Sequence, residues 1–144
     1  MAESDNPTFA IMGSGGMGGY IGAKLSQAGY QVSFIARGAH LAAMKNNGLK
    51  IEEPEAAFVI DPIQATSDPR DIGPVDFVIF CVKLWDTEAA GEQCRDLVGP
   101  NTAVLSMQNG VDAEPILSGI LGSQHVMGSP SEIGANIIEP GFVR

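Results

Sequence analysis

Short apolar runs alternate along this chain with segments in which apolar residues recur at three- or four-residue spacing. The first pattern is typical of buried strands and the second of helices that pack by one face. The apolar runs occupy residues 9–12, 31–36, 75–82, 103–107 and 125–127. The helical spacing occupies residues 17–28, 39–47, 87–98 and 112–121. The alternation predicts an α/β fold in which parallel strands are joined by helices.

Glycine and proline set the predicted ends of these elements. Gly29 and Gly48 end the first two helices, and Gly99-Pro100 ends the third. After the second helix the pattern is less regular, and we expect short strands at residues 49–52 and 58–60 and a helical turn within residues 66–71.

The run at residues 75–82 is almost continuously apolar. Such a run suits a parallel strand covered on both faces, so we expect it at the centre of the sheet. The predicted fold class is a Rossmann-type doubly wound parallel sheet with three α/β/α layers, whose strand carboxyl ends form one ligand-binding edge. One domain over residues 9–144 accounts for the pattern, and the polar residues 1–8 are expected to form a flexible lead-in.

Directly after the first predicted strand, Gly13, Gly15 and Gly18 fit the Gly-x-Gly-x-x-Gly fingerprint of dinucleotide-binding sites. The first glycine permits a tight turn, the second lets a pyrophosphate approach the backbone, and the third lets the next helix pack closely on the sheet. The helix N-terminus then offers N–H groups and partial positive charge to the phosphates. Because a strand, a helix and a second strand surround the glycines in the required order, we interpret this loop as a pyrophosphate site.

Acidic residues outnumber basic ones by 17 to 8, and the net charge of −9 argues against a nucleic-acid partner. Neither a membrane span nor a signal peptide is indicated, so we expect a cytoplasmic protein that binds no membrane. Cys81 and Cys94 lack the spacing of a metal site or disulfide framework, and reduced thiols are expected. His40 and His125 have no partners that suggest a triad or a metal site, so we interpret both as structural and expect no metal.

Arg37 follows the second strand, about 20 residues after the glycines, where an NAD site has an acidic residue for the ribose 2′-hydroxyl. A guanidinium binds a 2′-phosphate through paired hydrogen bonds, whereas a carboxylate repels it. Arg37 therefore predicts a preference for NADP(H) over NAD(H). Lys83 follows the central strand directly and can reach an anionic group of the cofactor from the same edge.

Gln108-Asn109-Gly110 follows the next predicted strand. The Asn109 amide offers a donor and an acceptor where cofactor and substrate meet, but Asn-Gly is also a common turn pair, and the residues alone leave both interpretations open. Trp85, close to Lys83, can cover an adenine ring or pack against a helix start, and packing is the preferred interpretation.

Five features occur in a fixed order: Gly13-Ser-Gly-Gly-Met-Gly18, Arg37, Cys81-Val-Lys-Leu-Trp85, Ser106-Met-Gln-Asn-Gly-Val111 and Glu139-Pro-Gly-Phe-Val-Arg144. Together they resemble the N-terminal half of the ketopantoate reductase family. The resemblance implies NADPH-dependent reduction of a small 2-keto acid, 2-dehydropantoate, to pantoate, on the route to pantothenate and coenzyme A.

The resemblance also implies a set of cofactor-binding residues: Gly13, Ser14, Gly15, Gly16, Met17, Gly18, Arg37, Lys83, Asn109 and Ala135. The glycine loop would hold the pyrophosphate, and Arg37 and Lys83 would lie near the adenosine 2′-phosphate. Asn109 would lie near the nicotinamide ribose and also bind substrate, and Ala135 would supply a backbone contact.

In this family a helical C-terminal domain supplies the lysine that acts as general acid, and this chain ends at Arg144. The resemblance thus implies no catalytic residue within these 144 residues, and we expect a fragment that does not turn over alone. In the complete enzyme the nicotinamide hydride would pass to the 2-keto carbon while the lysine protonates the carbonyl oxygen. A homodimer of the full-length form is compatible with the resemblance.

Two other functions remain open. A different NADP-dependent 2-keto acid, β-hydroxyacid or 6-phosphogluconate-type dehydrogenase would share this domain, and so would a non-catalytic nucleotide-sensing Rossmann module. A methyltransferase that uses S-adenosylmethionine is disfavoured, since such enzymes usually have an acidic residue where Arg37 stands.

Overall fold

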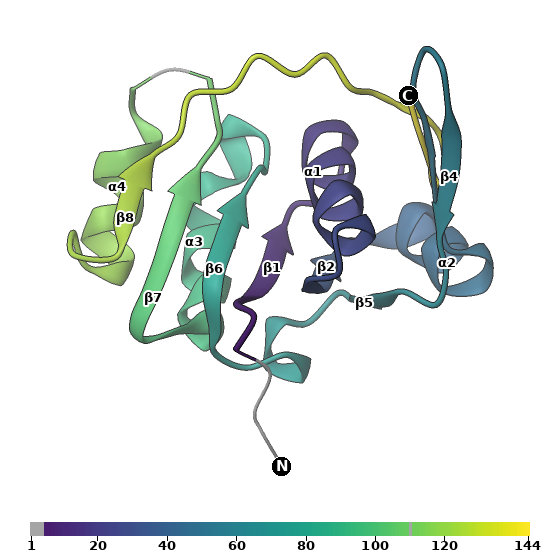
Figure 1. Ribbon diagram of the computed structural model, residues 1–144. Coiled ribbons are helices and arrows are strands. Elements are labelled where there is room, and N and C mark those ends of the chain that lie inside the picture. Colours follow the sequence, from purple (N-terminus) through teal and green to yellow (C-terminus); the bar gives the residue numbers. More distant parts are fainter. Residues whose placement is uncertain (1–4, 110) are drawn as a thin grey trace.

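The computed structural model describes residues 5–109 and 111–144 of the chain. Its centre is a six-stranded parallel sheet in the order β5-β2-β1-β6-β7-β8 (Figure 1). The strands are β1 (Thr8–Met12), β2 (Gln31–Ile35), β5 (Gln64–Thr66), β6 (Val75–Phe80), β7 (Val98–Ser106) and β8 (Val126–Gly128). The helices are α1 (Gly16–Gln27), α2 (Gly38–Asn47), α3 (Thr87–Gln93) and α4 (Ala113–Leu121), with 3₁₀ turns at Pro69–Asp71, Leu84–Asp86 and Cys94–Leu97. The Rossmann-type doubly wound α/β fold predicted from the sequence is confirmed.

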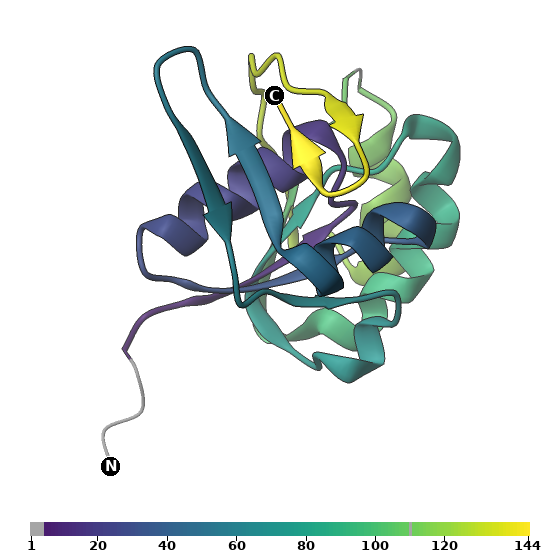
Figure 2. The same cartoon turned by 90° about the vertical axis from the view of Figure 1, so that its right-hand side faces the viewer.

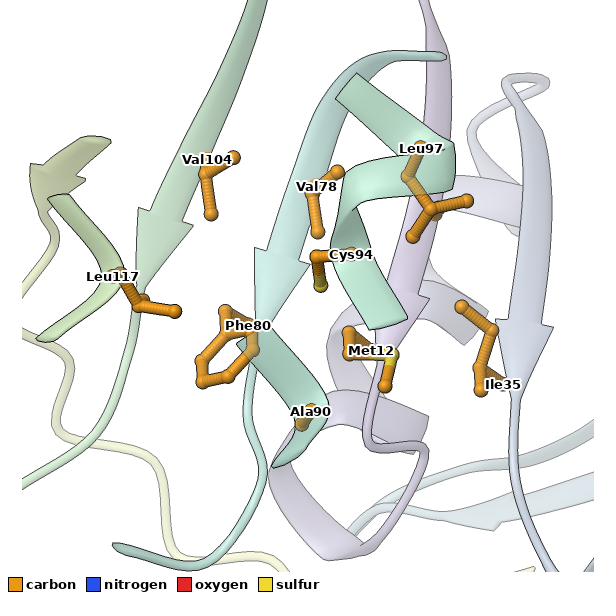
Figure 3. Close-up of a cluster of buried hydrophobic side chains, with 10 residues drawn as sticks. Met12, Ile35, Val78, Phe80, Ala90, Cys94, Leu97, Val104 and Leu117 are labelled. Carbon is orange, nitrogen blue, oxygen red and sulfur yellow. The ribbon is translucent and has the colours of Figure 1, made fainter. Parts of the chain in front are cut away.

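Two apolar cores fill the spaces on the two faces of this sheet. The first core, shown in Figure 3, joins Met12, Ile35, Val78, Phe80 and Val104 of the strands to Ala90, Cys94, Leu97 and Leu117 of α3, the turn after it and α4. The second core joins Ile11, Phe34 and Ile79 to Ala23 of α1 and Met44 of α2. Successive residues of β1 and β6 therefore enter opposite cores, which is why both strands are apolar at consecutive positions.

A second sheet lies beside α1, with the order β4-β3-β10-β9. Its strands are β3 (Leu49–Glu52), β4 (Ala57–Ile60), β9 (Ile137–Glu139) and β10 (Phe142–Val143). The pattern predicts β3 and β4 but neither β9 nor β10. After β8 the chain crosses over the carboxyl edge of the main sheet (Figure 1), and β10 then pairs in parallel with β3 (Figure 2). Since this pairing joins distant parts of the chain, no local pattern reports it.

The third predicted helix ends earlier, and the strand after it begins earlier, than the pattern predicts. Val98 and Gly99-Pro100 belong to β7 rather than to a helix end, because Val98 pairs with Val75 of β6 and the Gly99 N–H donates to Thr102 Oγ1 at 2.8 Å. The strand β5 was not predicted, since its three residues are too few to show a period.

The lead-in is shorter than predicted, because Thr8 is already part of β1. Its backbone N–H donates to Asp76 Oδ2 at 2.8 Å. Residues 1–4 of the predicted lead-in lie outside the described residues.

Candidate functional site

A cleft of about 470 Å³ opens at the carboxyl edge of β1, β2 and β6. Its walls come from the β1–α1 loop, from Arg37 and His40 after β2, from Lys83 and Asp86 after β6, and from α3. Ile137 of β9 completes it. This is the edge at which doubly wound sheets bind their ligands.

The glycines of the loop have three different surroundings. Gly13 has φ +95°, and a Cβ there would lie 2.9 Å from the Val82 nitrogen, so this turn requires glycine. A Cβ on Gly18 would overlap the carbonyl oxygen of Gly13, which shows how closely α1 packs on the loop. Gly15 lines the cleft, and the nearest atom to its Cβ position is 4.0 Å away. Gly15 therefore leaves its side of the cleft open to a ligand.

The N-terminus of α1 is suited to an anion. The helix begins at Gly16 without a side-chain cap and without an acidic residue in its first turn. First-turn N–H groups have no carbonyl partner inside a helix, and the dipole places partial positive charge there. Ser14, just before, is buried, and its N–H donates to the Ile35 carbonyl at 3.0 Å, which fixes the loop to β2.

Two cations predicted from the sequence line the same cleft. Arg37 and Lys83 follow β2 and β6, which lie on either side of β1, and both side chains are exposed. The Arg37 Nη2 atom lies 3.6 Å from Asp86 Oδ2, and the Arg37 side chain remains 82% exposed. The cleft thus combines a glycine loop, a helix N-terminus and two solvent-accessible cations, which is a set suited to a phosphate-bearing ligand.

His40 has both ring nitrogens engaged. The Gly141 N–H donates to Nδ1 at 2.9 Å, and Nε2 lies 2.7 Å from the Ser14 carbonyl oxygen. Since Nδ1 accepts, the proton is on Nε2 and the ring is neutral. His40 has a structural role, as predicted, and the segment that it holds in place is the glycine loop.

The segment before β9 lies against the start of α1. A Cβ on Gly16 would overlap the carbonyl oxygen of Ala135, and the Ser131 hydroxyl donates to Met17 Sδ at 3.3 Å. Ala135 is thus adjacent to the start of α1, whereas the cofactor contact that the resemblance implied for it stays a prediction. Ala135, Gly16, Met17 and Gly18 stand beside the cleft rather than among the residues that line it.

Gln108 holds the loop that carries Lys83. Its amide nitrogen donates to the Val82 carbonyl at 2.8 Å and to Thr87 Oγ1 at 2.9 Å. Thr87 is buried and donates in turn to the Leu84 carbonyl at 2.8 Å.

Asn109 is exposed after β7 and does not line the cleft, and Gly110 lies outside the described residues. The structure therefore brings Lys83 to the cleft but leaves Asn109 outside it.

Two further side chains bear on the chemistry of the edge. Cys81 lines the cleft, but burial raises the pKa of its thiol to about 12, so it is not a nucleophile near neutral pH. Trp85 is 82% exposed and lines no part of the cleft, so the prediction that it packs against a helix start is wrong.

Sequence reasoning missed several cleft residues, namely Ser67, Asp86, Ile137 and the bridging role of His40. Ile137 and the Gly141 partner of His40 reach the cleft only through the second sheet, which gives no local signal. Asp86 could have been found, because it lies three residues after Lys83 on the same turn.

Across residues 5–109 and 111–144, no cluster of His, Cys, Asp and Glu side chains could hold a metal ion. Within the same residues, every helix is too short or too polar to cross a membrane.

Known proteins are similar to this chain in sequence and in fold. The family model "Ketopantoate reductase PanE/ApbA" matches residues 9–144. A 2-dehydropantoate 2-reductase of Mesorhizobium japonicum is 40% identical over 105 residues, covering 72% of this chain and 32% of the relative. The crystal structure of 2-dehydropantoate 2-reductase from Porphyromonas gingivalis superposes with a TM-score of 0.90 at 34% identity, covering 96% of this chain and 51% of that one.

A complex of D-mandelate dehydrogenase with NADH also superposes, with a TM-score of 0.79 at 26% identity, covering 94% of this chain and 42% of that one. The chain thus spans about a third of the Mesorhizobium relative and about half of the Porphyromonas structure. The family match extends over every element of the Rossmann-type domain and the second sheet. The match over residues 9–144, together with the glycine loop and with Arg37 and Lys83 at the cleft, shows that the chain belongs to the ketopantoate reductase family.

Proposed function

We propose that this chain is the NADPH-binding part of an enzyme that reduces 2-dehydropantoate to pantoate. The observation that carries the proposal is the convergence of Arg37 and Lys83 on a cleft that also contains the glycine loop. A nicotinamide cofactor is what the family and the NADH-bound neighbour suggest for such a cleft.

The preference for NADPH rests on charge. An NADPH molecule differs from NADH by a 2′-phosphate on the adenosine ribose, and Arg37 follows β2 at the position where this fold meets that ribose. Its side chain is 82% exposed and its contact with Asp86 is 3.6 Å long, so the guanidinium can still form paired hydrogen bonds to a phosphate. Lys83 adds a second positive charge at the same cleft.

Within the proposed reaction, the bound nicotinamide supplies a hydride to the 2-keto carbon. The residues of this chain hold and orient the cofactor: Gly15 leaves room for the pyrophosphate, and the start of α1 stabilises its charge. We assign Asn109 to the nicotinamide ribose and substrate, since it follows β7 at the carboxyl edge of the sheet. Neither His40 nor Cys81 of the cleft is available as the general acid at the carbonyl oxygen, because both ring nitrogens of His40 are engaged in hydrogen bonds and the Cys81 thiol is buried.

We propose that the general acid is a lysine of a helical domain that covers this edge. Large apolar side chains are exposed after β6 (Leu84 and Trp85), after β7 (Val111) and on β9 (Ile137). Exposed apolar side chains gathered in one region are typical of surfaces that another domain or partner covers.

A reductase for a different 2-keto acid is the second candidate. The likeness to D-mandelate dehydrogenase at 26% identity favours it, because that protein has this domain and a different named substrate. The substrate would then be selected by residues outside this chain.

Nucleotide titration tests the cofactor. The chain is titrated with NADPH and with NADH, and nicotinamide fluorescence gives each Kd. We expect NADPH to bind more tightly and the difference to be lost in Arg37→Ala. The matched control is Arg70→Ala, which removes another exposed arginine paired with an aspartate outside the cleft. Equal Kd values in the unaltered chain, or an Arg37→Ala chain that keeps the preference, would overturn the 2′-phosphate site.

Assays of the chain extended by a helical domain, with 2-dehydropantoate and with other 2-keto acids, test the substrate. A kcat/KM at least tenfold higher for 2-dehydropantoate is expected, since one well-placed group in a substrate site is worth about that factor. A higher value for another 2-keto acid would favour the second candidate.

A further inference from the structure

Among the residues that line the cleft, Arg37, Lys83 and Asp86 carry full charges, and Asp86 is the carboxylate. Its Oδ2 atom lies 3.6 Å from Arg37 Nη2, which is beyond ordinary hydrogen-bond length. The side chain of Arg37 is 82% exposed, whereas that of Asp86 is 34% exposed. The pair is a loose ion contact between an exposed cation and a partly buried anion.

The backbone of Asp86 is fixed from several sides. Its N–H donates to the Lys83 carbonyl at 2.9 Å, and it directly precedes Thr87, the buried first residue of α3. Thr87 is bonded to Leu84 and Gln108. A ligand that arrives at Arg37 can therefore move the arginine side chain more readily than it can move the Asp86 backbone.

We infer that Asp86 is a specificity-determining residue, which opposes Arg37 and limits the preference of the cleft for NADPH over NADH. This inference rests on the proposed function, since it takes Arg37 as the 2′-phosphate partner. A phosphate bound to Arg37 lies within a few ångströms of the Asp86 carboxylate and is repelled by it. A ribose 2′-hydroxyl at the same place can donate a hydrogen bond to that carboxylate.

The size of the effect follows from Coulomb's law. Two unit charges about 4 Å apart in water change an equilibrium constant by about fivefold, and a 2′-phosphate carries up to two negative charges. Removing the charge of Asp86 should therefore raise the affinity for NADPH by about tenfold. The affinity for NADH should fall by a few-fold, because an amide accepts a hydrogen bond less strongly than a carboxylate.

The experiment measures the Kd values for NADPH and NADH in the unaltered chain, Asp86→Asn, Arg37→Ala and Glu92→Gln. The Asn variant keeps the shape of Asp86 and removes its charge. Glu92→Gln is the matched control, since Glu92 lies on α3, is paired with Arg95 and does not line the cleft. Thermal unfolding of each variant checks that it is folded before its Kd values are used.

We expect the ratio of the NADH Kd to the NADPH Kd to rise at least fivefold in Asp86→Asn and to stay unchanged in Glu92→Gln. If Arg37→Ala lowers the ratio but Asp86→Asn leaves it unchanged or lowers it, the inference is overturned and the proposed function stands. If Arg37→Ala leaves the ratio unchanged, the 2′-phosphate site is wrong and the inference fails with it.

Discussion

The Nε2 atom of His40 lies 2.7 Å from the carbonyl oxygen of Ser14, and this contact ties α2 to the glycine loop. The other ring nitrogen accepts the N–H of Gly141, which is 101 residues further along the chain. One neutral imidazole therefore joins the loop to the turn between β9 and β10, and it couples the second sheet to the cleft.

Replacing this imidazole should weaken both stability and nucleotide binding. In His40→Phe two hydrogen bonds are lost, at about 1 kcal/mol each, so we expect the free energy of unfolding to fall by about 2 kcal/mol. The NADPH Kd should rise because the loop is no longer held. His125→Phe is the control: it loses one bond of 2.8 Å to the Thr102 carbonyl and lies outside the cleft. An unchanged Kd in His40→Phe would show that the loop needs no such support.

A methyl group at Gly16 should push away the segment before β9. Its Cβ would overlap the Ala135 carbonyl oxygen, whereas a Cβ on Gly134 would meet no atom within 4 Å. In Gly16→Ala we expect faster hydrogen exchange at the Asn136 and Arg144 amides, which bond each other's carbonyls at 2.8 and 2.9 Å. Gly134→Ala should leave the exchange unchanged. Equal exchange in both variants would contradict the close contact at Gly16.

Gln108→Glu should destabilise the loop that carries Lys83. The amide nitrogen of Gln108 faces a carbonyl oxygen, that of Val82, and a carboxylate cannot donate to it. We expect the free energy of unfolding, measured with urea, to fall by about 2 kcal/mol, because a partly buried acceptor loses its donor. Gln64→Glu, at an exposed position of the edge strand β5, makes the same change of charge and should alter stability little.

The two thiols should make stability fall at high pH. Burial raises the pKa of Cys81 and Cys94 from 9.0 to about 12. Between these values the unfolded chain has lost thiol protons that the folded chain keeps, so stability decreases as pH rises through this window. Urea midpoints measured on both sides of pH 9 test this, and Cys81→Ala/Cys94→Ala should show a shallower decrease. A double variant with the same slope would exclude the thiols as its cause.

Trp85 is the single tryptophan of the chain and should report its own exposure. Because its side chain is 82% exposed, we expect emission close to that of free tryptophan and strong quenching by acrylamide. Adding the helical domain should shift the emission to shorter wavelength if that domain covers Leu84 and Trp85. A tryptophan already protected in this chain would contradict the exposed position.

Much of the main sheet could be predicted because its signals are local. The glycine loop, the strand β6 and the stop at Gly48 each lie within a few residues and follow from sterics and burial. Arg37 and Lys83 could be assigned to one edge, because parallel strands place their carboxyl ends together. The cofactor contacts assigned to all ten residues stay predictions: Gly13, Ser14, Gly15, Gly16, Met17, Gly18, Arg37, Lys83, Asn109 and Ala135.

The sequence by itself determined the α/β class, the glycine loop and the place of Arg37 and Lys83 at the ligand edge. The class follows from the spacing of apolar residues in strands and helices, and the loop and the two cations follow from their positions directly after predicted strands. Only the tertiary structure decided the second sheet, the bridge through His40 and the contact between Arg37 and Asp86. These depend on segments that meet in space after long separations in the chain. Such contacts are selected by the packing of the whole domain, and no local period encodes them.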